Sequence, residues 1–249
     1  MRTLIIGDVH GCLEEFQALL GKVSFVQGQD RLVSLGDLLD RGPDPVGCVK
    51  FAREMGALAV KSNHDEKAVR WGAHEVKRKD TGKKNPMKVS PEKVAQYQAL
   101  SEQDIQWLAA LPLSLDLGDG LWAVHAGMEP AFPLSEQSDA VIRVRYVDDG
   151  TRGKLGEMVG FSEGSLEQPS DTVYWTEQWK GPESIVYGHA VHSLVDPRVD
   201  SFPGGKCYGI DTGSCFGGRL TCMVWIPGQE PEFVQVQAAK EYCAKDKRH

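Results

Sequence analysis

The sequence LIIGDVHG, at residues 4–11, decides the fold, because a short apolar run ends in Gly-Asp and a histidine follows two residues later. A second such run, LVSLGDLLDRG at residues 32–42, repeats the arrangement. Apolar side chains at helical spacing fill residues 12–20, and a helical pattern with proline in its first turn covers 45–55. A third apolar run, at 57–60, leads into Ser-Asn-His-Asp. The order strand, helix, strand, helix, strand predicts parallel βαβ units.

The rest of the chain is predicted to contain a helical insertion and a second set of strands. Residues 66–111 form the insertion, in which helical patterns at 90–100 and 102–111 follow a polar segment. The later apolar runs are short and separated by Gly or Pro, as in hairpins, and they cover 113–117, 121–124, 184–187, 206–210, 220–225 and 232–236. Residues 147–171 read as an irregular loop. With no repeat and no linker, residues 1–249 are expected to form a single domain.

Composition narrows the range of functions. The 249 residues include 28 Lys and Arg against 35 Asp and Glu, a net charge of -7, which argues against bulk binding of DNA. The sequence contains no run of 18 apolar residues, so a membrane-spanning helix is not expected. The N-terminus lacks the pattern of a signal peptide. The six cysteines are scattered and form no Cys-x-x-Cys pair, so free thiols and a cytoplasmic location are expected.

Polar side chains suited to binding metal ions or phosphate follow the apolar runs along the chain. They are Asp8 and His10, then Asp37, Asp40 and Arg41, then Asn63 and His64, and finally His125 and His189. In open α/β sheets the carboxyl ends of the strands line the ligand crevice, so these side chains are expected to converge. A set of carboxylates, one amide and imidazoles without thiolates suits Mn, Fe, Co or Zn better than Ca. Any one motif alone would be ordinary turn chemistry, and only the joint pattern indicates a metal site.

The spacing of these residues suggests a two-metal hydrolase. Asp8 and His10 can grip one ion, and the two oxygens of Asp37 can bridge it to a second ion. Two ions about 3.5–4 Å apart hold phosphoryl oxygens and generate a bridging hydroxide. Arg41 can bind phosphate through its fork of donors. His64 can protonate the leaving oxygen, with Asp40 orienting its ring.

The motifs closely resemble those of the calcineurin-like metallophosphoesterases of the phosphoprotein-phosphatase superfamily. They are GDVHG (7–11), GDLLDRG (36–42), SNHD (62–65), HAG (125–127) and GH (188–189). The resemblance implies a four-layer αββα sandwich of two mixed β-sheets. It implies one metal on Asp8, His10 and Asp37, a second on Asp37, Asn63, His125 and His189, Arg41 on phosphate, and the Asp40–His64 pair as acid. Manganese is expected first, with iron, cobalt, zinc or magnesium as alternatives. Ser62 replaces the usual glycine, and we expect a slight change of loop geometry without loss of activity.

The C-terminal part resembles one branch of that superfamily. IVYGHAVHSLVDPRVD (185–200) and YGIDTGSCFGGRLTCMVW (208–225) look like the bacterial diadenosine tetraphosphatase-like enzymes. The resemblance implies hydrolysis of a dinucleoside polyphosphate such as diadenosine tetraphosphate, or of a nucleotide cap on an RNA 5′ end. It also implies a second phosphate-binding arginine, for which we favour Arg143 over Arg145, although both could be solvated strand residues. The same site residues would serve a serine/threonine protein phosphatase or a broad phosphomonoesterase. A non-catalytic metal-dependent binding protein would lack a ligand or the acid, and none is missing.

Residues 77–84, KRKDTGKK, form a local cationic cluster on an acidic chain. The simpler interpretation is a solvated, mobile loop, since charge runs usually face water. The functional interpretation is a lid that attracts a polyphosphate toward the metals through its local potential.

Overall fold

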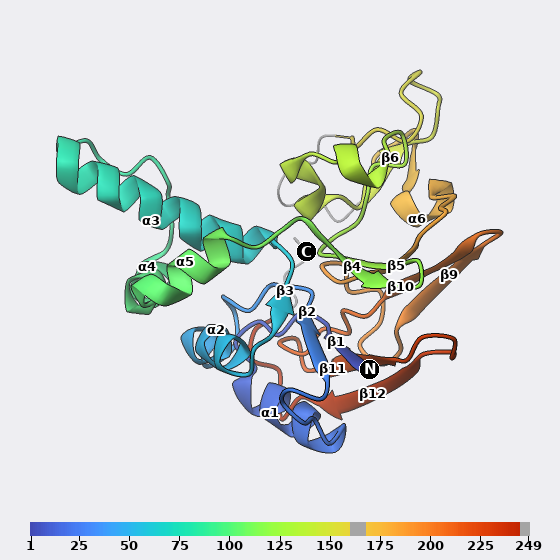
Figure 1. Ribbon diagram of the computed structural model, residues 1–249. Coiled ribbons are helices and arrows are strands. Elements are labelled where there is room, and N and C mark those ends of the chain that lie inside the picture. Colours follow the sequence, from blue (N-terminus) through green and yellow to red (C-terminus); the bar gives the residue numbers. More distant parts are fainter. Residues whose placement is uncertain (160–167, 245–249) are drawn as a thin grey trace.

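Two five-stranded mixed sheets lie face to face in the computed structural model, which describes residues 1–159 and 168–244 (Figure 1). The first sheet has the order β12-β11-β1-β2-β3. Its strands β1, β2 and β3 are parallel, which confirms the predicted βαβ units. Strands β11 and β12 add to it in antiparallel fashion. The bounds are β1 Thr3–Ile6, β2 Arg31–Ser34, β3 Leu58–Ala59, β11 Arg219–Trp225 and β12 Glu232–Gln237.

The second sheet has the order β4-β5-β8-β10-β9. Its strands are β4 Ser114–Gly118, β5 Leu121–Val124, β8 Ser184–Tyr187, β9 Arg198–Phe202 and β10 Gly205–Gly209. The expectation of hairpins is correct for β4–β5 and for β11–β12. It is wrong for β5, β8 and β10, which are parallel, because long connections return the chain to the same end of the sheet before each of these strands. Strand β9, which the sequence analysis did not predict, pairs with β10 as a hairpin.

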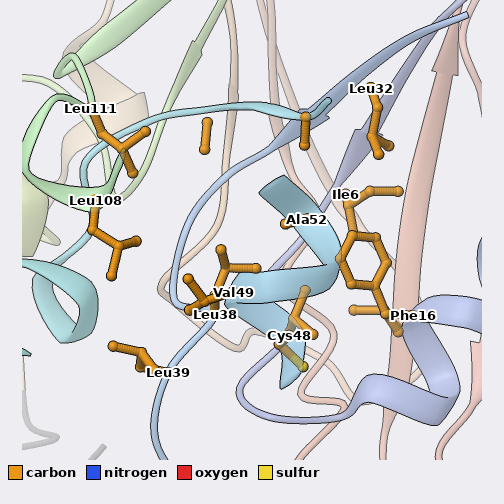
Figure 2. Close-up of a cluster of buried hydrophobic side chains, with 14 of the residues drawn as sticks. Ile6, Phe16, Leu32, Leu38, Leu39, Cys48, Val49, Ala52, Leu108 and Leu111 are labelled. Atoms are coloured by element: carbon orange, nitrogen blue, oxygen red, sulfur yellow. The ribbon is translucent and has the colours of Figure 1, made fainter. Parts of the chain in front are cut away.

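Successive side chains of a strand point to opposite faces of its sheet, so each sheet packs against a different layer on each face. In β1, Ile5 packs between the two sheets, whereas Leu4 and Ile6 face outward. Helices α1 (Leu13–Lys22) and α2 (Pro45–Glu54) cover that outer face. Figure 2 shows Ile6 of β1 and Leu32 of β2 in this cluster, with Phe16 of α1 and Val49 of α2.

The outer face of the second sheet is covered by shorter elements. Trp175 of α6 (Trp175–Gln178) packs there against Ile185 and Tyr187 of β8, with the 3₁₀ helix η2 (Asp139–Arg143) beside them. A further 3₁₀ turn, η1, spans Leu134–Glu136. The predicted four-layer αββα sandwich is therefore confirmed, with a fourth layer made of short helical turns.

Three helices project together from the edge of the sandwich, on the left of Figure 1. They are α3 (Asn63–Thr81), α4 (Pro91–Ala99) and α5 (Glu102–Ala109). The last two were predicted. The first is not indicated by the sequence, because no apolar stripe marks its 19 residues, of which the structure buries only Asp65, Ala68 and Trp71. Residues 77–81 are thus the last turns of a helix that ends at the left-handed Gly82, and the mobile-loop interpretation is wrong for them.

Residues 147–171 are not wholly irregular. Strand β6 (Tyr146–Asp148) pairs antiparallel with β7 (Thr172–Tyr174) across this segment. Its residues 160–167 lie outside the described residues.

The structure also bears on the cysteines and on membrane-spanning helices. The cysteines are free thiols, as predicted. Within residues 1–159 and 168–244, no helix is long and apolar enough to cross a membrane.

Candidate functional site

Two groups of potential metal ligands form where the loops after β1, β2, β5 and β8 meet the start of α3. One group is His10, Asp37 and His64, and the other is Asp37, His125 and His189, with ligand atoms within 4.8 Å of one another in each group. Asp37 belongs to both groups. Its Oδ2 lies 3.3 Å from His10 Nε2, and its Oδ1 lies 3.5 Å from His125 Nε2. The two oxygens of one carboxylate thus face the two halves of the site.

Buried leucines anchor the loop that carries Asp37 and Asp40. Leu38 and Leu39 of the GDLLDRG motif are fully buried in the core beneath α2. Burial of a leucine stabilises a fold by about 2 kcal/mol, so this apolar pair fixes the polar residues on either side. The backbone of Asp37 has a φ of 49° and that of Asp40 a φ of 68°, a region that L-residues rarely adopt.

The loop after β8 approaches Asp8 closely. The backbone N–H of His189 donates to Asp8 Oδ2 at 3.0 Å. A Cβ atom on Gly188 would lie 2.0 Å from Asp8 Oδ1, so only glycine permits this approach. His189 then turns with a φ of 65°, and its Nδ1 lies 3.1 Å from Asn63 Oδ1.

Asp37 is held by the N-terminus of α3. Its backbone N–H donates to Ser62 Oγ at 2.8 Å, and the backbone N–H of His64 donates to its Oδ1 at 3.1 Å. Burial would raise the pKa of Asp37, but the neighbouring histidines, led by His125 and His64, hold it well below its usual value. The residue is therefore a carboxylate in the folded protein.

The buried His10 and His125 turn their Nε2 atoms toward the site. His10 donates from Nδ1 to the carbonyl of Leu39 at 3.0 Å, and His125 donates from Nδ1 to that of Leu35 at 2.7 Å. Burial lowers the pKa of both imidazoles, whereas the charge of Asp37 acts in the opposite direction, and in its neutral form each ring carries a lone pair on Nε2. Neutral imidazoles fixed in this way by a backbone carbonyl are typical metal ligands.

Acceptors face acceptors at the centre of the site. His125 Nε2, with its lone pair, lies 2.8 Å from the amide oxygen of Asn63. Asp8 Oδ1 is buried without a hydrogen-bond partner among the described residues. Burial, Asp211 and Asp37 raise the pKa of Asp8 well above its usual value. A cation among these atoms would make this arrangement attractive, so the residues present fit divalent metal ions.

The pair predicted to act as acid is formed. His64 Nδ1 donates to Asp40 Oδ2 at 2.5 Å, and the ammonium of Lys93 donates to the same oxygen. Burial opposes ionisation of Asp40, but the hydrogen bond from His64 and the charge of Lys93 lower its pKa to about 2. The His64 side chain is 14% exposed, and its Nε2 faces Arg41 Nη2 at 3.3 Å.

Arg41 lies beside the histidines of the first ligand group. Its Nη1 is 2.8 Å from His10 Nε2 and its Nη2 is 3.3 Å from His64 Nε2. The guanidinium carbon is 5.1 Å from the ring centroid of Phe216, so the aromatic face supports the cation. An anion bound at this guanidinium would lie beside His10 and His64, the two histidines of the first ligand group.

The two further arginines lie at different places. Arg143 ends η2 and donates from Nη2 to Glu66 Oε2 of α3 at 3.0 Å. Arg145 donates from Nη2 to the backbone carbonyl of His189 at 3.4 Å, and its Nε is buried without a partner among the described residues. Neither belongs to a strand.

Several residues of the site escaped the sequence analysis. Asp65 accepts from the backbone N–H groups of Leu38 and Leu39, and burial and the charge of Asp37 raise its pKa to about 6. Ser62 with Asp65 has the spacing of a helix N-cap, a signal that predicts the start of α3. Lys93 carried no comparable signal. Lys77 lies 14 residues after Asn63, about 21 Å along the helix, too far to touch a phosphate at the metal ligands.

Ser62→Ala is expected to weaken both fold and site. The change removes the cap of α3 and leaves the Asp37 N–H without its acceptor, which should lower the free energy of unfolding by about 2 kcal/mol. Urea unfolding of the metal-free protein measures this loss, and calorimetric titration with Mn²⁺ should show weaker binding. Ser101→Ala is the matched control, because Ser101 caps α5 away from the site. Unchanged Mn²⁺ affinity in Ser62→Ala would contradict the role assigned to Ser62.

Comparison with known proteins gives the family. A family model described as calcineurin-like phosphoesterase matches residues 1–208. The symmetrical bis(5'-nucleosyl)-tetraphosphatase of Citrobacter koseri is 28% identical over 267 residues, covering 90% of this chain and 92% of that protein. The protein of the same name from Shigella dysenteriae is 29% identical over 269 residues with the same coverage.

Solved structures agree with this. One, provisionally assigned as a diadenosine tetraphosphatase, is 27% identical, covers 94% of this chain and 93% of its own, and has a TM-score of 0.71. A metallophosphoesterase from Sphaerobacter thermophilus, 19% identical, shares the fold with a TM-score of 0.56 over 96% of this chain and 89% of its own. The chain is therefore a hydrolase that belongs to the calcineurin-like phosphoesterase family.

Proposed function

We propose that the protein hydrolyses dinucleoside polyphosphates such as diadenosine tetraphosphate, and that cleavage is symmetrical. One water is consumed, the central phosphoanhydride bond breaks, and two molecules of ADP leave. The position of Asp37 in both ligand groups carries the proposal, because it fits a pair of cations that share one carboxylate. The names of the relatives, which span nearly the whole chain, support the choice of substrate.

The two groups around Asp37 support the ligand assignment that the motifs suggest. Asp8, His10 and Asp37 would hold one divalent ion, and Asp37, Asn63, His125 and His189 the other. Manganese is our first choice for this set of oxygen and imidazole donors. Such ions would supply Lewis acidity, which draws charge from the phosphate oxygens and activates water for attack at phosphorus.

The remaining residues bind and protonate the substrate. Arg41 binds a phosphate through its two terminal nitrogens, which already lie beside His10 and His64. His64 gives a proton from Nε2 to the leaving phosphate oxygen, while Asp40 fixes the ring through Nδ1. For the second phosphate-binding arginine we now rank Arg145 before Arg143, because Arg145 contacts the His189 loop whereas Arg143 is engaged by Glu66.

Product identity tests the proposal. After incubation with Mn²⁺ and diadenosine tetraphosphate, anion-exchange chromatography should show ADP alone. ATP together with AMP would contradict symmetrical cleavage. A parallel assay on phosphoserine peptides addresses the alternative of a protein phosphatase, and faster release of phosphate from the peptide would overturn the choice of substrate. Nucleotide-capped RNA 5′ ends contain the same phosphoanhydride linkage and stay a predicted substrate of second choice, as the cytoplasm stays the predicted location.

A further inference from the structure

The carboxylate that orients His64 is covered by the helical insertion. Asp40 is fully buried, and its Oδ2 accepts from His64 Nδ1 on one side and from Lys93 Nζ on the other. Lys93 belongs to α4, which lies far from Asp40 in the sequence, and its side chain is 30% exposed. The insertion thus places a permanent cation on a carboxylate that the GDLLDRG loop alone would present only to an imidazole.

A second residue of α4 lies on the same side. Tyr97 follows Lys93 by four residues, one helical turn, so both side chains share a face of the helix. Its ring is buried against Trp71 of α3, with ring centroids 5.7 Å apart. Burial, and next the charge of Asp40, raise the pKa of its hydroxyl. Tyr97 Oη and Asp40 Oδ1 are both buried without a geometric hydrogen-bond partner among the described residues, and the effect of Asp40 on the Tyr97 pKa places the two groups near each other.

Electrostatics gives Lys93 a task that His64 cannot perform alone. An ionised carboxylate without water is stable only beside a compensating charge. His64 faces the reacting atoms, whereas Lys93 donates to the same Asp40 oxygen from the side of the insertion. Held by this second donor, the Asp40 carboxylate keeps its position and continues to accept the hydrogen bond that orients the His64 ring.

We propose that Lys93 is a positioning residue for the proton-donating pair, and that α4, through Lys93 and Tyr97, makes the insertion part of the active site. The inference rests on the proposed role of His64 as the acid. It extends the Asp40–His64 pair to a network of three residues. Asp40 belongs to the sandwich, and Lys93 belongs to α4 of the projecting helices. Lys93 touches Asp40 and no reacting atom, so it acts through the geometry of its neighbour.

The test replaces Lys93 with methionine, which keeps the length of the side chain and removes the charge. With the Mn²⁺-loaded protein and diadenosine tetraphosphate, kcat should fall about 10-fold with little change in KM, because orientation of the acid is lost and substrate binding is not. Lys93→Arg should restore most of the rate. Lys88→Met is the matched control, since Lys88 is an exposed residue of the same insertion, and it should behave as the unaltered protein.

A spectroscopic measurement separates the inference from the proposed function. In proton NMR of the metal-free protein, the Nδ1–H of His64 should give a strongly downfield signal, identified by its loss in Asp40→Asn. That signal should move in Lys93→Met and stay in place in Lys93→Arg and Lys88→Met. If Lys93→Met does not fold, Lys93→Gln, which retains a polar end, should show the same displacement.

Each outcome bears on one claim. An unchanged signal and an unchanged kcat in the neutral Lys93 variants would overturn the inference. Equal losses in the methionine and arginine variants, with the signal in place, would reduce Lys93 to a structural role and also overturn it. A displaced signal in a protein that does not cleave diadenosine tetraphosphate would support the network and reject the proposed substrate.

Discussion

Asp37→Asn should lose about 1000-fold in kcat/KM on diadenosine tetraphosphate, which corresponds to about 4 kcal/mol of transition-state stabilisation. Asp37 is the one residue common to both ligand groups, and it is ionised although fully buried. The amide has no charge and only one acceptor oxygen, so it cannot serve both groups. We expect the variant to bind fewer Mn²⁺ ions per chain, as measured by elemental analysis after dialysis.

The control for this change is Asp80→Asn, which removes an exposed carboxylate from α3 and should leave metal content and turnover unchanged. Because the backbone contacts of Asp37 with Ser62 involve its N–H and not its carboxylate, the variant should still fold. Retention of two ions and of most activity in Asp37→Asn would refute the bridging role.

His64→Asn should lower kcat by about 10²–10⁴-fold while leaving the metal content nearly intact. The asparagine can occupy the space beside Asp40, but it has no proton to give to the leaving oxygen. The deficit should be larger for an ester with a poor leaving group than for one with a good leaving group, which needs little protonation. Steady-state kinetics on such a pair of esters, with metal analysis of the same samples, measures both effects.

His74→Asn is the matched control, since His74 lies on the same helix outside both ligand groups. Two results would speak against the assignment. Full activity of His64→Asn on the ester with the poor leaving group would show that another residue is the acid. Loss of a metal ion would instead make His64 a ligand, as its place in the group with His10 and Asp37 allows.

The parts of the site that follow strands were predictable, because the carboxyl ends of parallel strands meet at one edge. His125 and His189 are far apart in the sequence, yet both reach Asn63, as their positions after predicted strands required. The βαβ part of the first sheet was equally predictable, and the helical pattern at 45–55 within it corresponds to α2, Pro45–Glu54. Periodicity and turn residues are local signals, and they were sufficient here.

The parts that depend on docking were not predictable. The long helix α3 carries few apolar side chains, and it is stabilised by its cap at Ser62 and by packing of Trp71 against α4. The contact of Lys93 with Asp40 depends on how α4 lies against the sandwich, which no local pattern records. The parallel course of β5, β8 and β10 likewise follows from long connections and not from the strands themselves.

The left-handed backbone at the site has a consequence for how such a protein can evolve. His10, Asp37, Asp40, Arg41 and His189 all have a positive φ, which costs about 1 kcal/mol or more at each residue and which glycine would adopt with less strain. Selection for heat resistance alone would therefore favour glycine at these positions and erase the reacting groups one by one. Selection for turnover keeps imidazole, carboxylate and guanidinium there, so the strained backbone is a stability cost that the reacting groups impose on the fold.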